Sequence, residues 1–374
     1  MSQTSPDVST TVRPTKRLQL GFLNNVPFSE FAPGGMGQGL KEAMELFGIA
    51  EELGYDVGWV RNRHFDNYLA SPLTLLTAAA QKTERIRLGT AIIPVGYENP
   101  IRLAEDAAVA DLLSDQRIEL GIATGFNSFP DIFGTPYDLE TWKSKAYDRV
   151  TATVEAIEGK VLGSSADGSF EFIVRPHSPT LRDRIWYGPG GVASTARAGR
   201  DGFDLQLSAI APHIDLPFDQ AQLRQIEALR QNWTRTDRDP RVSTSRLFFP
   251  FRNESQRKLY QEYADLRGEQ GAAASRPKGS IPHGSRPIPA VVGLAGPDGK
   301  PKYDAPGLMS PVVVGEPAEI VDYLRSDAAV AESDQLNIFL PPGFSQTQYI
   351  ELLENIAQDV AGELGWAPAN TVVR

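Results

Sequence analysis

The sequence lacks several of the residues on which protein chemistry often depends. It has no cysteine, which excludes disulfide bonds, thiolate nucleophiles and thiolate metal ligands. Its four histidines, His64, His177, His213 and His283, are widely spaced, so a histidine-based metal site has little support. No apolar run approaches the ~18 residues that a membrane span needs, and the first residues contain no apolar block that could act as a secretory signal. We therefore expect a cytoplasmic protein with no metal centre and no membrane contact.

The charge and the common motifs exclude further classes. The net charge of -10 argues against a nucleic-acid or anionic-membrane surface, because both favour basic patches. There is no HExxH and no GxSxG motif. The glycine-rich stretches at 34–39 and 293–301 do not have the spacing or the strand context of dinucleotide or phosphate loops. A Rossmann dehydrogenase, a P-loop enzyme and a metallohydrolase are all disfavoured.

The 374 residues show an alternation of strand-like and helix-like segments. Strands are expected at 18–24, 56–60, 86–95, 117–124, 184–188, 203–209, 241–252 and 335–342. Helices are expected at 40–54, 71–83, 99–114, 145–159, 192–202, 219–233, 317–330 and 347–365, with Ser71 and Asn99 as N-caps. About eight strands, each followed by a helix, predict an α/β fold that closes into a (β/α)₈ TIM barrel, with an open parallel sheet as the alternative.

Two segments interrupt this pattern. Residues 1–17 are polar and rich in Ser and Thr, so we expect a flexible leader before a single barrel domain at 18–366. Residues 268–308, before the last strand–helix unit, are dense in Gly, Pro and Ser. This long insertion is either a plain surface loop or, as we favour, a mobile lid, because long barrel loops usually serve the active site.

Polar and small residues follow several of the expected strands, where a barrel builds its active site. Arg61, Asn62, Arg63 and His64 follow the second strand, and the stretch "WYGPGGVAS" leads from the fifth strand into a helix. Small residues let backbone N–H groups approach an anion, and a helix N-terminus adds a favourable dipole. The same turn with no ligand is an equally good interpretation of the glycines alone. A lone histidine beside Phe65 can likewise be structural.

Taken together, the motifs resemble the bacterial-luciferase-like flavin-dependent monooxygenase family. The resemblance runs across residues 18–160, 184–209 and 311–366, and its most specific part is the long block that begins "ASPLTLL" at position 70 and ends "GIATG" at position 125. The resemblance implies a TIM barrel, usually dimeric, that binds FMN at the carboxyl ends of its strands. It also implies that the protein accepts reduced FMN from a separate NAD(P)H-dependent flavin reductase. With O₂, such enzymes form a C4a-hydroperoxyflavin that oxidises a small organic substrate.

The resemblance also assigns site residues. Cofactor-binding positions carried over from the family are Asn62, Thr90, Ala91, Ile92, Ala123, Thr124, Arg149, Gly190, Gly191 and Ser194. Among these, the phosphate would be held by Gly190, Gly191 and Ser194, with Arg149 as a further contact. Positions 90–92 match the strand under the flavin ring, where the family can have a non-proline cis peptide. Thr124 replaces an arginine of the luciferases.

Arg63 and His64 are the expected catalytic residues. In luciferases the second strand ends in Glu-His-His-Phe, whereas this chain has Asn62-Arg63-His64-Phe65, with arginine in place of the histidine that acts as the base. An arginine stays protonated and stabilises an anion instead of accepting a proton. The substrate of luciferase therefore does not carry over. A deazaflavin-dependent oxidoreductase of the same superfamily and a non-catalytic flavin-binding protein stay open as alternatives.

Overall fold

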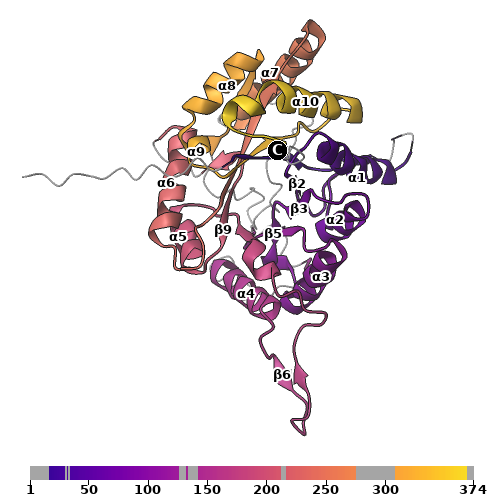
Figure 1. The fold of residues 1–374 in the computed structure, drawn as a ribbon, viewed down its shortest axis with the longest axis vertical. Coiled ribbons are helices and arrows are strands. Elements are labelled where there is room, and N and C mark those ends of the chain that lie inside the picture. The colour runs from indigo at the N-terminus through magenta and orange to yellow at the C-terminus, as the bar shows by residue number, and fades with distance from the viewer. Residues whose placement is uncertain are drawn as a thin grey trace, which may run out of the picture.

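A computed structural model describes residues 17–29, 32, 34–125, 132–133, 142–211, 216–274 and 308–368. Its centre is a closed barrel of eight parallel strands, each hydrogen-bonded to two neighbours (Figure 1). In order around the barrel they are β1 (Gln19–Asn24), β2 (Val57–Val60), β3 (Arg87–Thr90), β5 (Ile118–Ala123), β8 (Ile185–Tyr187), β9 (Asp204–Leu207), β11 (Val242–Pro250) and β14 (Gln335–Phe339). The predicted TIM barrel is confirmed.

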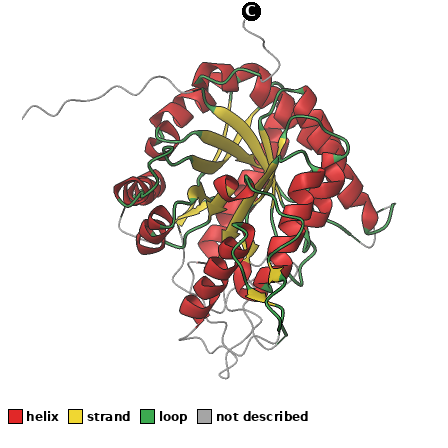
Figure 2. Ribbon diagram, turned by 60° about the horizontal axis from the view of Figure 1, so that its bottom comes forward, coloured by secondary structure: helices red, strands yellow, loops and turns green. Residues whose placement is uncertain are grey.

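Helices surround the barrel on all sides, as the views along and across it show (Figures 1 and 2). They are α1 (Gly37–Glu52), α2 (Pro72–Ala80), α3 (Pro100–Leu113), α4 (Trp142–Ile157), α5 (Val192–Arg200), α6 (Phe218–Gln231), α7 (Glu254–Ala274), α8 (Pro317–Ser326), α9 (Ala328–Ala331) and α10 (Gln346–Asp359). Asn99 caps α3 as predicted, because its side chain accepts hydrogen bonds from the N–H groups of Ile101 and Arg102. Ser71 is at the expected N-cap position of α2, but its hydroxyl makes no capping bond to a backbone N–H and bonds the Thr74 hydroxyl instead.

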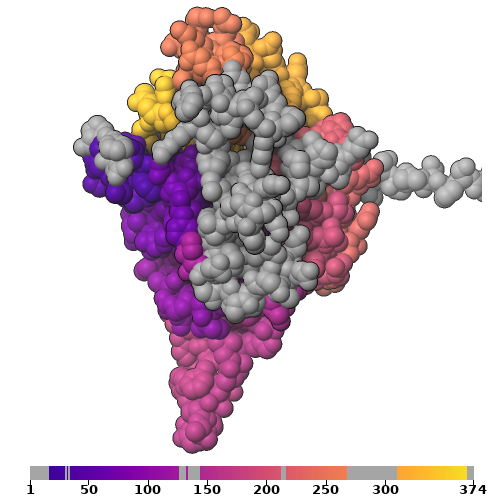
Figure 3. Space-filling view, turned by 180° about the vertical axis from the view of Figure 1, so that it is seen from behind, coloured from indigo at the N-terminus to yellow at the C-terminus, as the bar shows by residue number. Residues whose placement is uncertain are grey.

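Several short elements decorate this frame. They are β4 (Ile93–Pro94), β6 (Gly163–Ser164), β7 (Glu171–Phe172), β10 (Ile210–Ala211), β12 (Leu308–Met309), β13 (Val312–Gly315) and the 3₁₀ turns η1 (Val95–Tyr97), η2 (Leu181–Arg184) and η3 (Ala361–Leu364). The hairpin of β6 and β7 projects from the barrel below α4, in Figure 1 and from behind in Figure 3. β13 pairs with the second half of β11, outside the closed ring.

Side chains alternate between the barrel interior and the helices, as the pleat of a strand requires. On the outside, Phe22 of β1 packs edge-on against Phe47 of α1, with ring centroids 5.1 Å apart. Inside, Trp59 of β2 meets Trp186 of β8 at 5.6 Å, and these strands are not neighbours, so the contact crosses the interior. Large side chains therefore fill the barrel, and any ligand must bind at its end.

The insertion differs in part from the expectation. The first residues of the expected lid, up to Ala274, are helical, because α7 continues through them, and the last, Leu308, begins β12. Residues 275–307 and the expected leader up to residue 16 lie outside the described residues, so the expectation of a mobile lid and a flexible leader stays a prediction. In the part of the chain that is described, no helix combines the length and the apolar character needed to cross a membrane.

Candidate active site at the carboxyl end of the barrel

Three strand ends lie side by side at the carboxyl end of the barrel, which we call the barrel mouth. A Cβ built on Gly188, just after β8, would lie 3.0 Å from Cγ2 of Ile92 and 3.9 Å from Cβ of Ala123. The peptide bond between Ala91 and Ile92 is cis, at the place where the resemblance leads us to look for one. The structure thus brings together Ala91, Ile92 and Ala123, three of the residues carried over as neighbours of the flavin ring.

Thr90, the last residue of β3, is hydrogen-bonded to β5 just below this region. Its hydroxyl donates to the carbonyl oxygen of Gly121 at 2.8 Å and accepts from the N–H of the same residue at 2.9 Å. The Thr90 side chain is fully buried, and both of these hydrogen bonds join it to β5. Thr90 is therefore placed to support the strand end below a cofactor, and its hydroxyl is not available as a ligand.

The end of β2 presents two polar atoms without partners among the described residues. Asn62 is 8% exposed, and within the described part of the chain neither its Oδ1 nor Nε2 of the half-buried His64 has a hydrogen-bond partner. The His64 ring packs edge-on against Tyr97 of η1 and Phe133, with ring centroids 5.7 Å and 4.8 Å apart. Burial lowers the pKa of His64, so its imidazole is neutral near pH 7. Buried polar atoms without partners are uncommon in folded proteins and point to a ligand or water at this position.

The two arginines of this segment have different surroundings. Arg63 forms an ion pair with Asp66, with 3.5 Å between Nε and Oδ2, and its backbone N–H donates to the carbonyl of Leu69. Arg61 donates its backbone N–H to the carbonyl of Asn24 at the end of β1. Removal from water and, second, the nearby Arg63 lower the pKa of Arg61 to about 10. The Arg61 guanidinium therefore remains charged at neutral pH.

The turn at the N-terminus of α5 has an open backbone. The hydroxyl of Ser194 accepts from the N–H of Gly191 at 3.1 Å and donates to its carbonyl at 2.8 Å, so Ser194 shapes the turn before the first helical residue. No atom lies within 4 Å of a Cβ built on Gly190, which leaves its face open. The first turn of a helix also has N–H groups with no partner within the helix. Gly190, Gly191 and Ser194 therefore lie together and match the expected phosphate position.

The two remaining carried-over residues connect neighbouring elements. Burial raises the pKa of the Tyr187 hydroxyl, and the nearby Thr124 acts in the opposite direction. Arg149 of α4 donates Nη1 to the carbonyl of Glu98 at 2.6 Å. This bond joins α4 to the segment that carries Tyr97, the neighbour of His64. Arg149 thus helps to position the wall of the barrel mouth through its bond to Glu98.

Sequence reasoning missed the aromatic wall around His64 and the contribution of α7. Tyr97 follows the third expected strand in "IIPVGYENP", where a polar aromatic side chain at a strand end is the available signal. Helix α7 was not expected, although Tyr260, Tyr263 and Arg267 recur at helical spacing.

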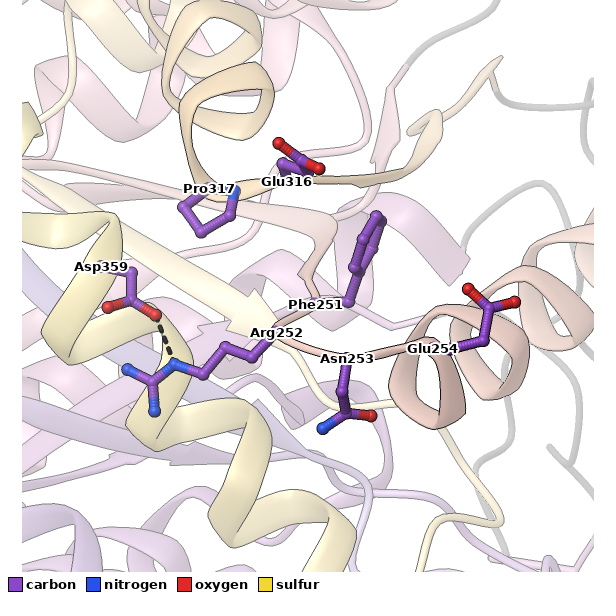
Figure 4. Close-up of a pocket in the computed structure, with 7 residues that line it drawn as sticks. All are labelled: Phe251, Arg252, Asn253, Glu254, Glu316, Pro317 and Asp359. Atoms are coloured by element: carbon purple, nitrogen blue, oxygen red, sulfur yellow. Dashed lines mark hydrogen bonds and ion pairs between the residues drawn. The ribbon is translucent and has the colours of Figure 1, made fainter.

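No group of three or more His, Asp or Glu residues placed to hold a metal occurs among the described residues. A shallow pocket elsewhere is lined by Phe251, Arg252, Asn253, Glu254, Glu316, Pro317 and Asp359 (Figure 4). There Arg252 is ion-paired with Asp359, and none of the candidate residues lines it. This pocket is therefore not part of the candidate site.

Comparison with known proteins identifies the class. A family model described as luciferase-like monooxygenase matches residues 22–326. The chain belongs to this family. The family includes flavin-dependent monooxygenases and deazaflavin-dependent oxidoreductases, as its relatives illustrate.

Two curated relatives and one solved structure show the range. Over 90 residues the chain is 38% identical to the oxygenase component of a flavin-dependent trigonelline monooxygenase from Acinetobacter baylyi, which is 24% of this chain and 25% of that protein. Over 199 residues it is 31% identical to an F420-dependent glucose-6-phosphate dehydrogenase from Kineococcus radiotolerans, which is 50% of this chain and 55% of that protein. The chain therefore spans about half or less of these curated relatives. The monooxygenase RslO1 from Streptomyces bottropensis has the same fold, with a TM-score of 0.68, 18% identity, and coverage of 93% of this chain and 100% of that one.

Proposed function

We propose that the protein is an FMN-dependent monooxygenase that oxidises a small organic substrate with O₂. It would receive reduced FMN from a separate NAD(P)H-dependent flavin reductase and act as a homodimer, as the family resemblance implies. One observation carries the proposal. The open turn at Gly190, after β8, and the polar atoms of Asn62 and His64 that lack hydrogen-bond partners among the described residues, after β2, all lie at the carboxyl ends of strands of the same barrel. Family membership and the flavin-dependent relative support the same cofactor class.

The residues of the barrel mouth fit a flavin mononucleotide. The phosphate would bind at Gly190, Gly191 and Ser194, where first-turn N–H groups and the dipole of α5 favour negative charge. The ring would lie beside Ile92 and Ala123, with the Oδ1 atom of Asn62 as a hydrogen-bond acceptor. Bound in its reduced form, FMN supplies the electrons that activate O₂.

The protein contributes positioning, charge and exclusion of water. His64, neutral near pH 7, is able to accept a proton at Nε2, which has no partner in the protein. Arg63, oriented by Asp66, supplies a fixed positive charge that stabilises negative charge developing nearby. The rings of Tyr97 and Phe133 shield His64 from solvent. A dry site protects reactive oxygen chemistry from water.

Cofactor affinity and oxygen reactivity test the proposal. We expect the full-length protein to bind reduced FMN more tightly than a deazaflavin, and to change the rate at which O₂ reoxidises reduced FMN in rapid-mixing absorbance measurements. Tight binding of the deazaflavin alone would refute the FMN assignment.

A deazaflavin-dependent oxidoreductase is the second candidate. It is favoured by the longer match to the dehydrogenase from Kineococcus radiotolerans. In that case the protein would transfer hydride and show no dependence on O₂. Tight FMN binding with reoxidation at the rate of free FMN, with and without added substrates, would favour a non-catalytic flavin-binding protein instead.

A further inference from the structure

Arg61 lies on the side of the barrel mouth formed by β14, β1 and β2. Its backbone is fixed by the hydrogen bond to Asn24, 3.0 Å long, at the end of β1. Among the described residues, no hydrogen bond or ion pair holds its half-buried guanidinium group, and the charged groups that influence it are Arg63, Arg267 and Asp66. A guanidinium drawn out of water normally has an anionic partner.

The loop after β2 is tied to the loop after β1. Tyr68 forms a backbone bridge with Pro27, and the N–H of Phe28 donates to the carbonyl of Asn67 at 3.1 Å. Two non-glycine residues adopt left-handed backbone conformations here, Val26 with φ of 52° and Phe65 with φ of 56°. Such conformations are rare for branched or bulky residues and persist where the surroundings hold them. The loop that presents Tyr68 is therefore well defined.

Helix α7 contributes two further side chains to this side of the barrel mouth, Tyr263 and Arg267. Tyr263 and Arg267 are one turn apart on the same face of the helix. The Tyr263 ring packs against Phe249 and Phe344, with centroid distances of 5.6 Å and 5.8 Å. Tyr263 is 8% exposed, yet its hydroxyl has no hydrogen-bond partner in the part of the chain that the structure describes. A buried hydroxyl held in place without a partner indicates a missing ligand or water.

These groups form one electrostatic unit, the arginine–tyrosine cluster of Arg61, Arg63, Tyr68, Tyr263 and Arg267. Burial raises the pKa of Tyr68 and raises that of Tyr263 to about 12; beyond this, Tyr68 lies close enough to all three arginines and to Asp66 to feel their charges, and Tyr263 lies close enough to Arg267 and Tyr68. The carboxylates of α7 up to residue 267, namely Glu254, Glu262 and Asp265, are all exposed. The cluster thus places three guanidinium groups near the carboxylate of Asp66, in a chain whose net charge is -10.

The cluster is not part of the proposed phosphate site. β2 and β8 are separated by β3 and β5 around the barrel, and α5 follows β8. The side chains of α7 approach from the opposite direction, over the segment after β14 that contains Phe344. An anion held by the cluster therefore belongs to a molecule, or to a part of one, that extends away from the phosphate.

We propose that Arg61, Arg267, Tyr68 and Tyr263 bind the oxyanion of the substrate, a small organic acid with a carboxylate or sulfonate group. Guanidinium groups match the geometry of such oxyanions, and tyrosine hydroxyls supply further donors. This inference rests on the proposed function, because it takes the barrel mouth as the place of reaction. The anionic group would anchor the substrate on the β2 side and leave the rest of it directed toward His64.

Isothermal titration with benzoate and benzenesulfonate tests the site, with neutral benzamide as the comparison and low ionic strength to limit screening. We expect saturable binding of the two anions to the full-length protein and none of benzamide. Arg61→Gln and Arg267→Gln should each weaken anion binding at least tenfold, and Tyr263→Phe about threefold, while FMN affinity changes less than twofold. Arg257→Gln is the matched control, because Arg257 is an exposed residue of the same helix, paired with Glu254. It should leave both affinities unchanged.

Each contrary outcome has a distinct meaning. No binding of either anion to the wild-type protein, or equal binding to wild type and Arg267→Gln, would overturn the inference. Loss of FMN affinity in Arg61→Gln and Arg267→Gln without loss of anion affinity would assign the cluster to the cofactor, and would also overturn it. Anion binding that depends on these arginines in a protein that does not bind FMN would preserve this site and refute the proposed function. Arg267→Gln and Tyr263→Phe keep the test decisive if Arg61→Gln does not fold.

Discussion

The turn before α5 allows a test that separates cofactor binding from folding. In Gly190→Asp the new Cβ meets no atom within 4 Å, and φ of Gly190 lies outside the left-handed region, so the variant should fold. Its carboxylate would lie next to the proposed phosphate. A carboxylate at the N-terminus of a helix is favourable by about 0.3–1 kcal/mol, so the free energy of unfolding should stay the same or rise.

The effect on FMN should be large and in the opposite direction. A phosphate with about 1.5 negative charges, roughly 5 Å from the new carboxylate, is repelled by about 1.2 kcal/mol in bulk water and about 5 kcal/mol near a protein surface. A middle value of about 2.5 kcal/mol corresponds to a roughly 70-fold increase in Kd.

Fluorescence titration of FMN measures this change, and two controls isolate its cause. Gly190→Asn has nearly the same shape without the charge and should bind FMN within a few-fold of wild type. Riboflavin, which has no phosphate, should bind wild type and Gly190→Asp equally. Wild-type affinity of Gly190→Asp for FMN would refute the assignment of the phosphate to this turn. An equal loss of riboflavin binding would show a steric cause in place of an electrostatic one.

Three further predictions concern stability. Burial lowers the pKa of His64 in the folded state, so as the pH falls below the ordinary histidine pKa of about 6.5 the unfolded chain binds more protons than the folded one. The contribution of His64 to the free energy of unfolding is thus complete above that pH and is lost as the pH falls. In urea unfolding, the free energy of unfolding of His64→Gln should therefore decline less steeply on the acid side than that of wild type, and an unchanged slope would contradict this. Arg246 and Asp327 form a buried bidentate ion pair with hydrogen bonds of 2.7 Å and 2.9 Å. Arg246→Met should therefore lower the free energy of unfolding by about 3–5 kcal/mol, because it leaves the Asp327 carboxylate buried without a partner. The double variant Arg246→Met with Asp327→Asn should recover part of this loss, and an equal loss in both variants would show that charge burial is not the cause. Gly121→Ala would place a Cβ 1.9 Å from the carbonyl oxygen of Thr90 and should lower the melting temperature by about 5 °C or more, whereas Gly190→Ala, with open space, should not.

The barrel was predictable because its signals are local and repeated. Eight alternations of strand and helix appear in the sequence, and caps such as Asn99 depend on neighbours two and three residues away. The parts that were missed have weak local signals. α7 has few apolar residues outside the stripe of Tyr260 and Tyr263, and β13 is four residues long. The projecting β6–β7 hairpin has strands of two residues each.

The candidate site shows the same division. The rule that barrel strands end at the active site was enough to single out residues at the ends of β2, β3, β5 and β8. It did not indicate that the Thr90 hydroxyl is hydrogen-bonded to Gly121 or that Arg149 is hydrogen-bonded to Glu98, because such pairings depend on strand register and helix packing. The arginine–tyrosine cluster could not be predicted from the sequence either. Tyr263 comes near Tyr68 of the loop after β2 because α7 packs against Phe344, which is far away in sequence from both.

The course of β11 has a consequence for how such proteins diversify. Its first half closes the barrel between β9 and β14, and its second half runs on to pair with β13, with Leu247 beside Val312 and Pro250 beside Gly315. The chain therefore leaves β11 and returns to it almost at the same point, so the two ends of this excursion lie together, while β12 within it pairs with β10 and α7 packs against Phe344. Because α7 belongs to that excursion, exchange of one continuous segment would bring a new set of side chains to the proposed reaction centre and leave the eight-stranded ring and the turn before α5 intact.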